Sequence, residues 1–242
     1  NGILYGVVTK YDFAQNYEVI FYQGYNLKQL KPQYIDLGIR KLSQSLGREP
    51  QRIWAPDFFQ DTDGTTYLFT TVNDKGRIKD KNNEEIFHHS IYVSKIDVSE
   101  MKVLETQSVD LPLDKNYIDA HVFQREDSYY LLVKDEFTKT IDYYQSDDLN
   151  NWNLVKEDFL SYAIGESIDY TEGQFTLNIG GTYYVFFDKY RGSDKYPKNQ
   201  YVITTTDFKN FSKPQVVTDS KKTILRHGSA IVYQEKPYEA IM

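Results

Sequence analysis

The chain has 242 residues, with 28 Lys and Arg against 35 Asp and Glu, and a formal net charge of −7. This acidic balance argues against nucleic acid or an anionic membrane surface as a partner. The absence of cysteine excludes disulfides, cysteine-ligated zinc and a thiol nucleophile. No apolar stretch approaches the roughly 20 residues of a membrane span, and no signal peptide is visible at the start, so a cytoplasmic and a bacterial secreted location both stay open.

Short runs of β-branched and aromatic residues, bounded by turn residues, predict strands along the whole chain. In chain order these runs are 16–22, 66–72, 90–94, 128–133, 182–187 and 200–204. Helix periodicity is confined to 36–45, which is short and has no capping residue. The 22 Tyr and 14 Phe also favour strands, and aromatic rings of this kind can stack on sugars. The chain is therefore predicted to be all-β.

Two sequence units recur in the same order. A turn followed by an aromatic strand occurs at 1–5, 62–69, 125–131 and 179–186, and a polar segment closes each module at 24–30, 94–99, 146–152 and 205–211. Modules of about 50–70 residues with about four strands each are typical of β-propeller blades. A β-sandwich with coincidental turn chemistry is the alternative.

The spacing of these units predicts one domain, a five-bladed β-propeller. The first module begins inside its turn-plus-strand unit and the last holds only one or two strands, so the first and last blades are expected to be incomplete in this chain. The approximate blades are 1–45, 50–105, 117–155, 168–215 and 222–242.

Polar residues mark the starts of four predicted inner strands. Because inner strands line the central channel of a propeller, these residues are expected to converge although they lie 50 or more residues apart. Convergent carboxylates in an aromatic-lined pocket suit glycosidic bond cleavage, which needs a proton donor and a second carboxylate. The four segments are Trp-Ala-Pro-Asp at 54–57, Ile-Asp-Ala-His-Val-Phe at 118–123, Tyr-Thr-Glu-Gly-Gln-Phe at 170–175 and Leu-Arg-His-Gly-Ser at 225–229.

Taken in order, these motifs resemble glycoside hydrolase family 43, a family of five-bladed propellers that act as β-xylosidases, α-L-arabinofuranosidases and arabinanases. The resemblance runs over residues 1–232, and the Ser-Asp-Asp-Leu-Asn-Asn-Trp segment at 146–152 resembles the family's blade ending. Invertase-type propellers fit less well because their Glu-Cys signature is absent. The resemblance implies inverting hydrolysis of oligosaccharides or polysaccharides that contain arabinose or xylose.

The resemblance also implies roles for two carboxylates. Glu172 would be the general acid, with a pKa held high, and Asp119 would orient it and raise that pKa. Glu166 is a rival acid, but no glycine follows it. The family usually has proline where this chain has Ala120 and Gln174, which would loosen the backbone or mark a divergent subgroup.

No general base is identified. The family's base aspartate lies on the first inner strand, and Asp12, the only acid in the first 17 residues, lies beyond the first predicted strand. The alternative reading is therefore a non-catalytic carbohydrate-binding propeller that lacks the base. A third reading is a propeller used for protein contacts.

Several further residues are candidates for the same pocket. Trp54, Asp57, Phe58, His121 and Arg226 are expected to contact the substrate, with packing between blades as the alternative for Trp54. By resemblance, His227 would lie near a hydrated calcium ion on the propeller axis, with core hydrogen bonding as the alternative. No other cofactor is expected. His88 and His89 fall in a polar insertion, 74–89, predicted as a long exposed loop.

Overall fold

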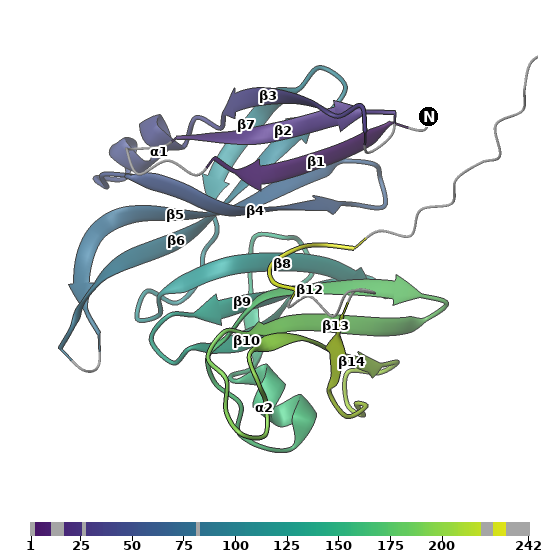
Figure 1. Cartoon of the computed structure of the whole chain (residues 1–242). Helices are drawn as coiled ribbons and strands as arrows, with labels where there is room; N and C mark the ends of the chain where they lie inside the picture. Colours follow the sequence, from purple (N-terminus) through teal and green to yellow (C-terminus); the bar gives the residue numbers. More distant parts are fainter. Residues whose placement is uncertain (1–2, 11–16, 26–27, 81–82, 219–224, 231–242) are drawn as a thin grey trace, which may run out of the picture.

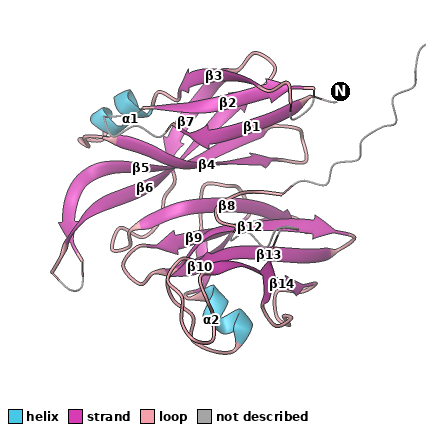
Figure 2. Ribbon diagram, viewed as in Figure 1, coloured by secondary structure: helices cyan, strands magenta, loops and turns pink. Residues whose placement is uncertain are grey.

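The computed structural model describes residues 3–10, 17–25, 28–80, 83–218 and 225–230. Within them the chain forms antiparallel sheets arranged as the blades of a propeller, so the all-β prediction is confirmed (Figures 1 and 2). The first sheet has three strands: β1 (Leu4–Thr9), β2 (Glu18–Gly24) and β3 (Lys31–Asp36). A short helix, α1 (Ile39–Ser45), leads from it to the second sheet.

The other three sheets have four strands each, in chain order from the inside outward. The second contains β4 (Arg52–Gln60), β5 (Thr66–Lys79), β6 (Glu85–Asp97) and β7 (Lys102–Ser108). The third contains β8 (Tyr117–Arg125), β9 (Ser128–Asp135), β10 (Thr140–Ser146) and β11 (Asn153–Lys156). The fourth contains β12 (Thr171–Ile179), β13 (Thr182–Lys189), β14 (Asn199–Thr205) and β15 (Gln215–Val217), and α2 (Phe159–Ile164) connects the third sheet to the fourth.

Four blades are present in the described residues, so a fifth is not confirmed. Most of the predicted fifth module, 222–242, lies outside the described part of the chain, and 225–230 contain no strand. The first sheet corresponds to the outer three strands of a blade. Thr9 on β1 accepts a hydrogen bond from the Ala55 amide at 3.0 Å, as Thr71 on β5, a second strand, accepts one from the Asp119 amide at 3.0 Å. β1 thus occupies the place of a second strand.

The hydrophobic core lies between successive sheets, as blade packing requires. One layer joins the first and second sheets around Phe21 and Tyr92, the next surrounds Phe69 and Tyr144, and the last is centred on Phe123 between the third and fourth sheets. Each fully buried side chain of this size contributes about 1.5–3 kcal/mol of hydrophobic stabilisation. Most of the unusual aromatic content therefore builds the core.

The insertion at 74–89 is not the exposed loop that the sequence predicts. β5 and β6 continue through it as a hairpin that curves away from the blades (Figure 1), with Arg77 opposite Phe87 and Lys79 opposite Glu85. His88 and His89 are each only 6% exposed. The alternation of apolar and charged residues lets the pairing continue, and Asn116 accepts the His89 amide at 2.8 Å.

Candidate active site

Each of the three inner strands β4, β8 and β12 carries a β-bulge near its start. Pairing with the second strand is interrupted after Trp54, Ile118 and Glu172. The residue that follows has a left-handed backbone in every case, with φ angles of 42° at Ala55, 55° at Asp119 and 58° at Gly173. His227, in the fourth of the sequence segments, adopts the same conformation with φ 39°. Because a bulge redirects side chains and terminates pairing, this repeat turns Asp119, Glu172 and His227 toward one place.

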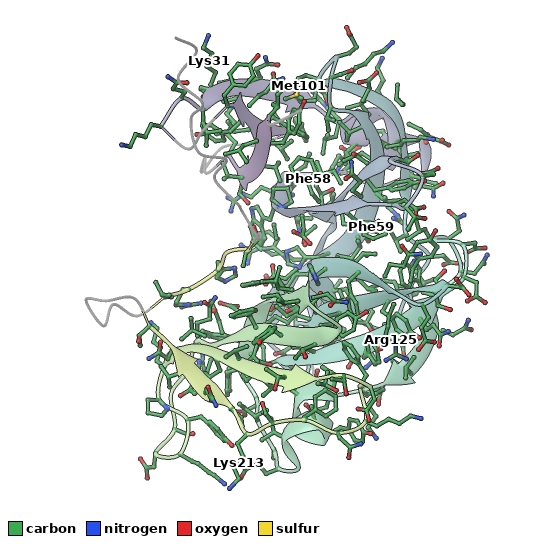
Figure 3. All side chains as sticks on the ribbon, turned by 90° about the vertical axis from the view of Figure 1, so that its right-hand side faces the viewer. Lys31, Phe58, Phe59, Met101, Arg125 and Lys213 are labelled. Carbon is green, nitrogen blue, oxygen red and sulfur yellow. The ribbon has the colours of Figure 1, made fainter. Side chains whose placement is uncertain are left out.

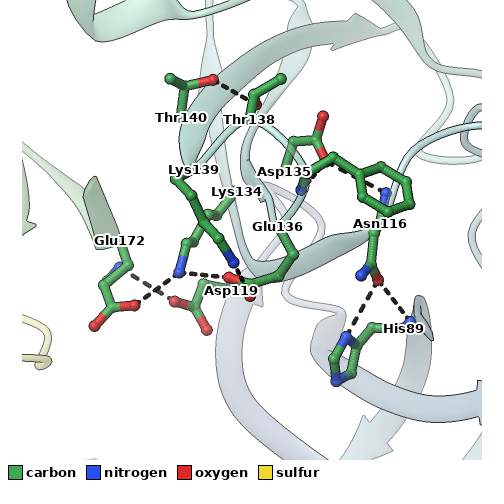
Figure 4. A network of polar contacts seen from close by, with 12 residues as sticks. His89, Asn116, Asp119, Lys134, Asp135, Glu136, Thr138, Lys139, Thr140 and Glu172 are labelled. Carbon is green, nitrogen blue, oxygen red and sulfur yellow. Dashed lines mark hydrogen bonds and ion pairs between the residues drawn. The ribbon is translucent and has the colours of Figure 1, made fainter. Parts of the chain in front are cut away.

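Glu172 lies at the centre of this cluster and is 14% exposed at its side chain. Its Oε2 accepts a hydrogen bond from Lys134 Nζ at 2.8 Å (Figure 4). Its Oε1 accepts from the Arg226 guanidinium and from His227 Nε2, the latter at 3.0 Å. Three cationic or protonatable side chains therefore surround one carboxylate.

These partners reverse the expected ionisation of Glu172. Burial alone raises its pKa, but the His227 hydrogen bond and the Lys134 charge outweigh burial and lower the pKa to about 2. The prediction of a raised pKa is wrong for this arrangement, because the sequence did not place Lys134 beside the carboxylate. The role of Glu172 as general acid stays a prediction.

Asp119 is adjacent to Glu172. Its Oδ2 accepts the Gly173 amide at 3.2 Å, and burial raises its pKa even though the charges of Lys134 and His227 lower it. Oxygen atoms of Asp119 and Glu172 lie within 4.8 Å of each other. An inverting pair of acid and base needs about 6.5–9.5 Å between its carboxyl groups to admit a water. Asp119 is therefore too close to be the base that works with Glu172.

Two residues of the cluster were not predicted from the sequence. Lys134 lies on β9 and is 3% exposed at its side chain, and Asp188 lies on β13 and is fully buried. Asp188 accepts the His227 amide at 2.7 Å and Arg226 Nε at 3.4 Å, so it fixes both residues against the sheet. The available signal was a charged residue that ends an otherwise apolar strand, in Leu-Val-Lys at 132–134 and Phe-Phe-Asp at 186–188.

Gln174 stands where the resemblance leads one to expect proline. Its side-chain amide donates to the carbonyl oxygens of Asp119 and, at 3.1 Å, of Leu132. This ties the bulge of β12 to that of β8. The departure from proline is thus compensated by side-chain hydrogen bonds.

Asp57 and His121 lie further along the inner strands and bind each other. His121 Nδ1 lies 2.7 Å from Asp57 Oδ2, while His121 Nε2 accepts the Thr176 amide at 2.9 Å. Both ring nitrogens are therefore occupied by the protein. The three residues link β4, β8 and β12 to one another.

The remaining candidates are dispersed. Trp54 packs against the His89 ring at 5.2 Å between centroids. Phe58 packs on Phe21 at 5.3 Å in the core between the first and second sheets, on the opposite side of β4 from Phe59 (Figure 3), so it does not join the cluster. Glu166 is bound by Lys195 and Tyr196 outside the cluster. Asp12 lies outside the described residues.

Asp119, Glu172 and His227 are close enough together to bind a metal ion in principle. Calcium, however, prefers six to eight oxygen ligands. Here Lys134 and Arg226 already neutralise Glu172, and Asp119 already accepts the Gly173 amide. This donor set fits calcium poorly, and no catalytic step is assigned to a metal.

One family model and several solved structures match this chain. Residues 39–239 match a family model described as "probable glycosyl hydrolase domain", which is related to glycoside hydrolase family 43. No curated protein sequence matches the chain. Within the described residues, neither helix has the length and apolar character needed to cross a membrane.

Solved structures of low sequence identity share the fold. A thermostable family-43 glycoside hydrolase has a TM-score of 0.61 at 15% identity over 94% of this chain and 76% of its own. A sucrose-6-phosphate hydrolase from Lactobacillus gasseri has a TM-score of 0.62 at 18% identity, over 90% of this chain and 46% of its own. An exo-1,5-α-L-arabinanase from a bovine ruminal metagenomic library has a TM-score of 0.60 at 16% identity, over 93% of this chain and 72% of its own. The chain thus spans under half the length of one of these proteins, and the likeness establishes the fold alone.

Proposed function

The chain belongs to the glycosyl hydrolase family related to glycoside hydrolase family 43, and from this premise we propose that it hydrolyses arabinose- or xylose-containing oligosaccharides or polysaccharides by an inverting mechanism. The observation that carries the proposal is the convergence of Glu172 and Asp119 at the bulges of successive inner strands, with Arg226 beside them. Two carboxyl groups close together in one pocket are the usual equipment of acid-assisted glycoside cleavage.

In this mechanism Glu172 donates a proton to the leaving-group oxygen. Glu172 must first give up its outer partners, Arg226 and His227, because these stabilise its ionised form. Once a sugar replaces them, burial raises the pKa of Glu172 toward the protonated form, and Lys134 is the partner that still opposes this rise. Asp119 holds the backbone at Gly173, next to the acid, and adds a neighbouring carboxyl group. The general base is not assigned.

Substrates with different leaving groups test the proposal. Nitrophenolate leaves without protonation, whereas a sugar hydroxyl needs the acid. Glu172→Gln is therefore expected to lower turnover of arabino- and xylo-oligosaccharides by about 10²–10⁴-fold and to affect nitrophenyl α-L-arabinofuranoside and nitrophenyl β-D-xyloside much less. Glu166→Gln, at an acid outside the cluster, is the matched control. Equal losses on both substrate classes would contradict the role of Glu172 as acid.

A second candidate function is carbohydrate binding without turnover. The low pKa of Glu172 favours it, because a carboxylate held ionised at neutral pH accepts hydrogen bonds from sugar hydroxyls but has no proton to donate. Calorimetric titration with the same oligosaccharides distinguishes the two. Binding without product formation, abolished by Glu172→Gln, would support this second function.

A further inference from the structure

Three of the four left-handed residues at 55, 119, 173 and 227 donate their backbone amide to the same kind of partner. Ala55 donates to Thr9, Asp119 donates to Thr71, and His227 donates to Asp188. Each acceptor is a side chain on the second strand of the preceding blade, and Thr71 and Asp188 pair directly with the residue before the bulge of their own blade. The fold thus reserves this position for a hydrogen-bond acceptor.

Lys134 interrupts the pattern. It pairs with Ile118, the residue before the bulge of β8, and so occupies the acceptor position of its blade. A lysine ammonium only donates hydrogen bonds, so the Gly173 amide turns to Asp119 Oδ2 instead. A position that breaks a local structural rule in an otherwise regular repeat is expected to serve function.

The contacts of Lys134 show what replaces the lost acceptor. Its ammonium lies 2.8 Å from Glu172 Oε2 and 2.5 Å from Glu136 Oε1, and 4.6 Å from the centre of the Tyr190 ring. Lys139 holds the other oxygen of Glu136 at 2.8 Å (Figure 4). A chain of alternating charges therefore anchors Lys134 from the protein side and directs it at Glu172.

The two oxygens of Glu172 differ in accessibility. The partner of Oε2, Lys134, has a side chain only 3% exposed, whereas the partners of Oε1, Arg226 and His227, are 32% and 50% exposed. The other ionisable groups around Glu172 are Asp119, Asp188 and Tyr190. Water or a sugar hydroxyl can compete for the outer pair but not for the inner one.

We propose that Lys134 is a positioning residue that holds Oε2 of Glu172 against the protein and leaves Oε1 as the oxygen that exchanges Arg226 and His227 for the leaving-group oxygen of a glycoside. The proposal rests on the proposed function for the identity of that ligand. The anchoring itself does not depend on turnover.

Carboxyl NMR of the glutamate-labelled protein tests the anchoring without any substrate. Glu172 is identified by the signal missing from Glu172→Gln, and its pKa is measured in the wild type, Lys134→Met, Lys134→Arg and the control Lys195→Met, at a lysine that pairs with Glu166 outside the cluster. Loss of an opposite charge at this distance is expected to raise the pKa of Glu172 by about one to three pH units in Lys134→Met. Lys134→Arg is expected to keep the pKa of Glu172 low, and Lys195→Met to leave it unchanged.

An unchanged pKa of Glu172 in Lys134→Met would overturn the proposal. If this variant does not fold, the double variant Lys134→Met with Glu136→Gln is used. It removes the charge of Lys134 together with the carboxylate of Glu136 that would otherwise lose its partner, and the same rise in the pKa of Glu172 is expected. In the wild type, failure to hydrolyse any glycoside would refute the proposed function and leave the titration result standing. Where turnover exists, Lys134→Met should lower kcat on oligosaccharides at least about tenfold, with little change in KM.

Discussion

The Gly173 amide donates a hydrogen bond to Asp119 Oδ2 at 3.2 Å, where the corresponding amides of Ala55 and Asp119 donate to threonine hydroxyls. Asp119 therefore combines two tasks, since its carboxyl group fixes the bulge that carries Glu172 and also lies within 4.8 Å of that residue. The two tasks can be separated because an asparagine oxygen still accepts a hydrogen bond but carries no charge.

We expect Asp119→Asn to keep the free energy of unfolding within about 1 kcal/mol of the wild type, whereas Asp119→Ala loses about 1–3 kcal/mol because the Gly173 amide is left unpaired. Urea unfolding measures both. If the charge of Asp119 matters for the reaction, the two variants lose glycosidase activity equally. Full activity in Asp119→Asn would limit Asp119 to holding the backbone.

Gly173 is required for space more than for its backbone angle. Alanine, aspartate and histidine adopt the same left-handed conformation at the corresponding positions 55, 119 and 227. A Cβ on Gly173, however, would lie 3.1 Å from His227 Nδ1 and 3.4 Å from Asp188 Oδ2. Gly173→Ala is therefore expected to displace His227 from Glu172.

Gly180→Ala is the matched control, because Gly180 has φ 59° against 58° at Gly173 and no atom within 4 Å of an added Cβ. Both substitutions place a Cβ on a left-handed backbone, which lowers the free energy of unfolding by about 1–2 kcal/mol. Only Gly173→Ala should change the histidine ring NMR signals of His227. Unaltered His227 signals in that variant would show that the ring tolerates the methyl group in place.

His227 makes stability depend on pH. Its hydrogen bond to Glu172 raises its pKa, burial lowers it, and the nearby carboxylates raise it further, so the pKa is higher in the folded than in the unfolded chain. The stabilisation is fully present below the unfolded pKa of about 6.5 and is lost as the pH rises through the folded pKa. The difference in free energy of unfolding between wild type and His227→Gln should be larger at about pH 5.5 than at about pH 9.

Chemical unfolding of both proteins at the two pH values measures this difference. His88→Gln, at a buried histidine outside the cluster, is the control for a general effect of histidine loss. A difference that is equal at both pH values, or larger at the alkaline one, would contradict the ion pair between His227 and Glu172.

The strands were predictable because local signals determine them. Strand β9 extends the predicted run at 128–133 by two residues, and β13 extends the run at 182–187 by two. Turn residues and β-branched or aromatic runs fix where these strands begin and end. The second helix, α2, was missed because it has six residues and is held by burying Phe159 and Leu160 rather than by its own periodicity. The hairpin at 74–89 was missed because charged residues dominate its composition.

The cluster was predictable only in part. The motifs that contain Asp119, Glu172, Arg226 and His227 were found because they recur at the starts of inner strands. Lys134 and Asp188 were not found, because their importance depends on which residue they pair with across the sheet, and the register depends on bulges that have no clear sequence signature. The ionisation of Glu172 was mispredicted for the same reason.

His121 is expected to stabilise the propeller rather than to bind substrate. Its two ring nitrogens join Asp57 and Thr176, so His121→Leu leaves the Asp57 carboxylate and the Thr176 amide without these partners. We expect a loss of about 1–3 kcal/mol in the free energy of unfolding, which is the cost of one buried polar group left unpaired, because Asp57 is 27% exposed and solvent can replace part of its contact. Thr176→Val keeps the amide donor and removes only the hydroxyl contact at 2.9 Å, so it should lower the free energy of unfolding by about 1 kcal/mol or less.

Urea unfolding gives both values, and oligosaccharide affinity measured on the folded fraction should be the same in Thr176→Val as in the wild type. A His121→Leu protein as stable as the wild type, but with weakened sugar binding, would return His121 to the substrate site.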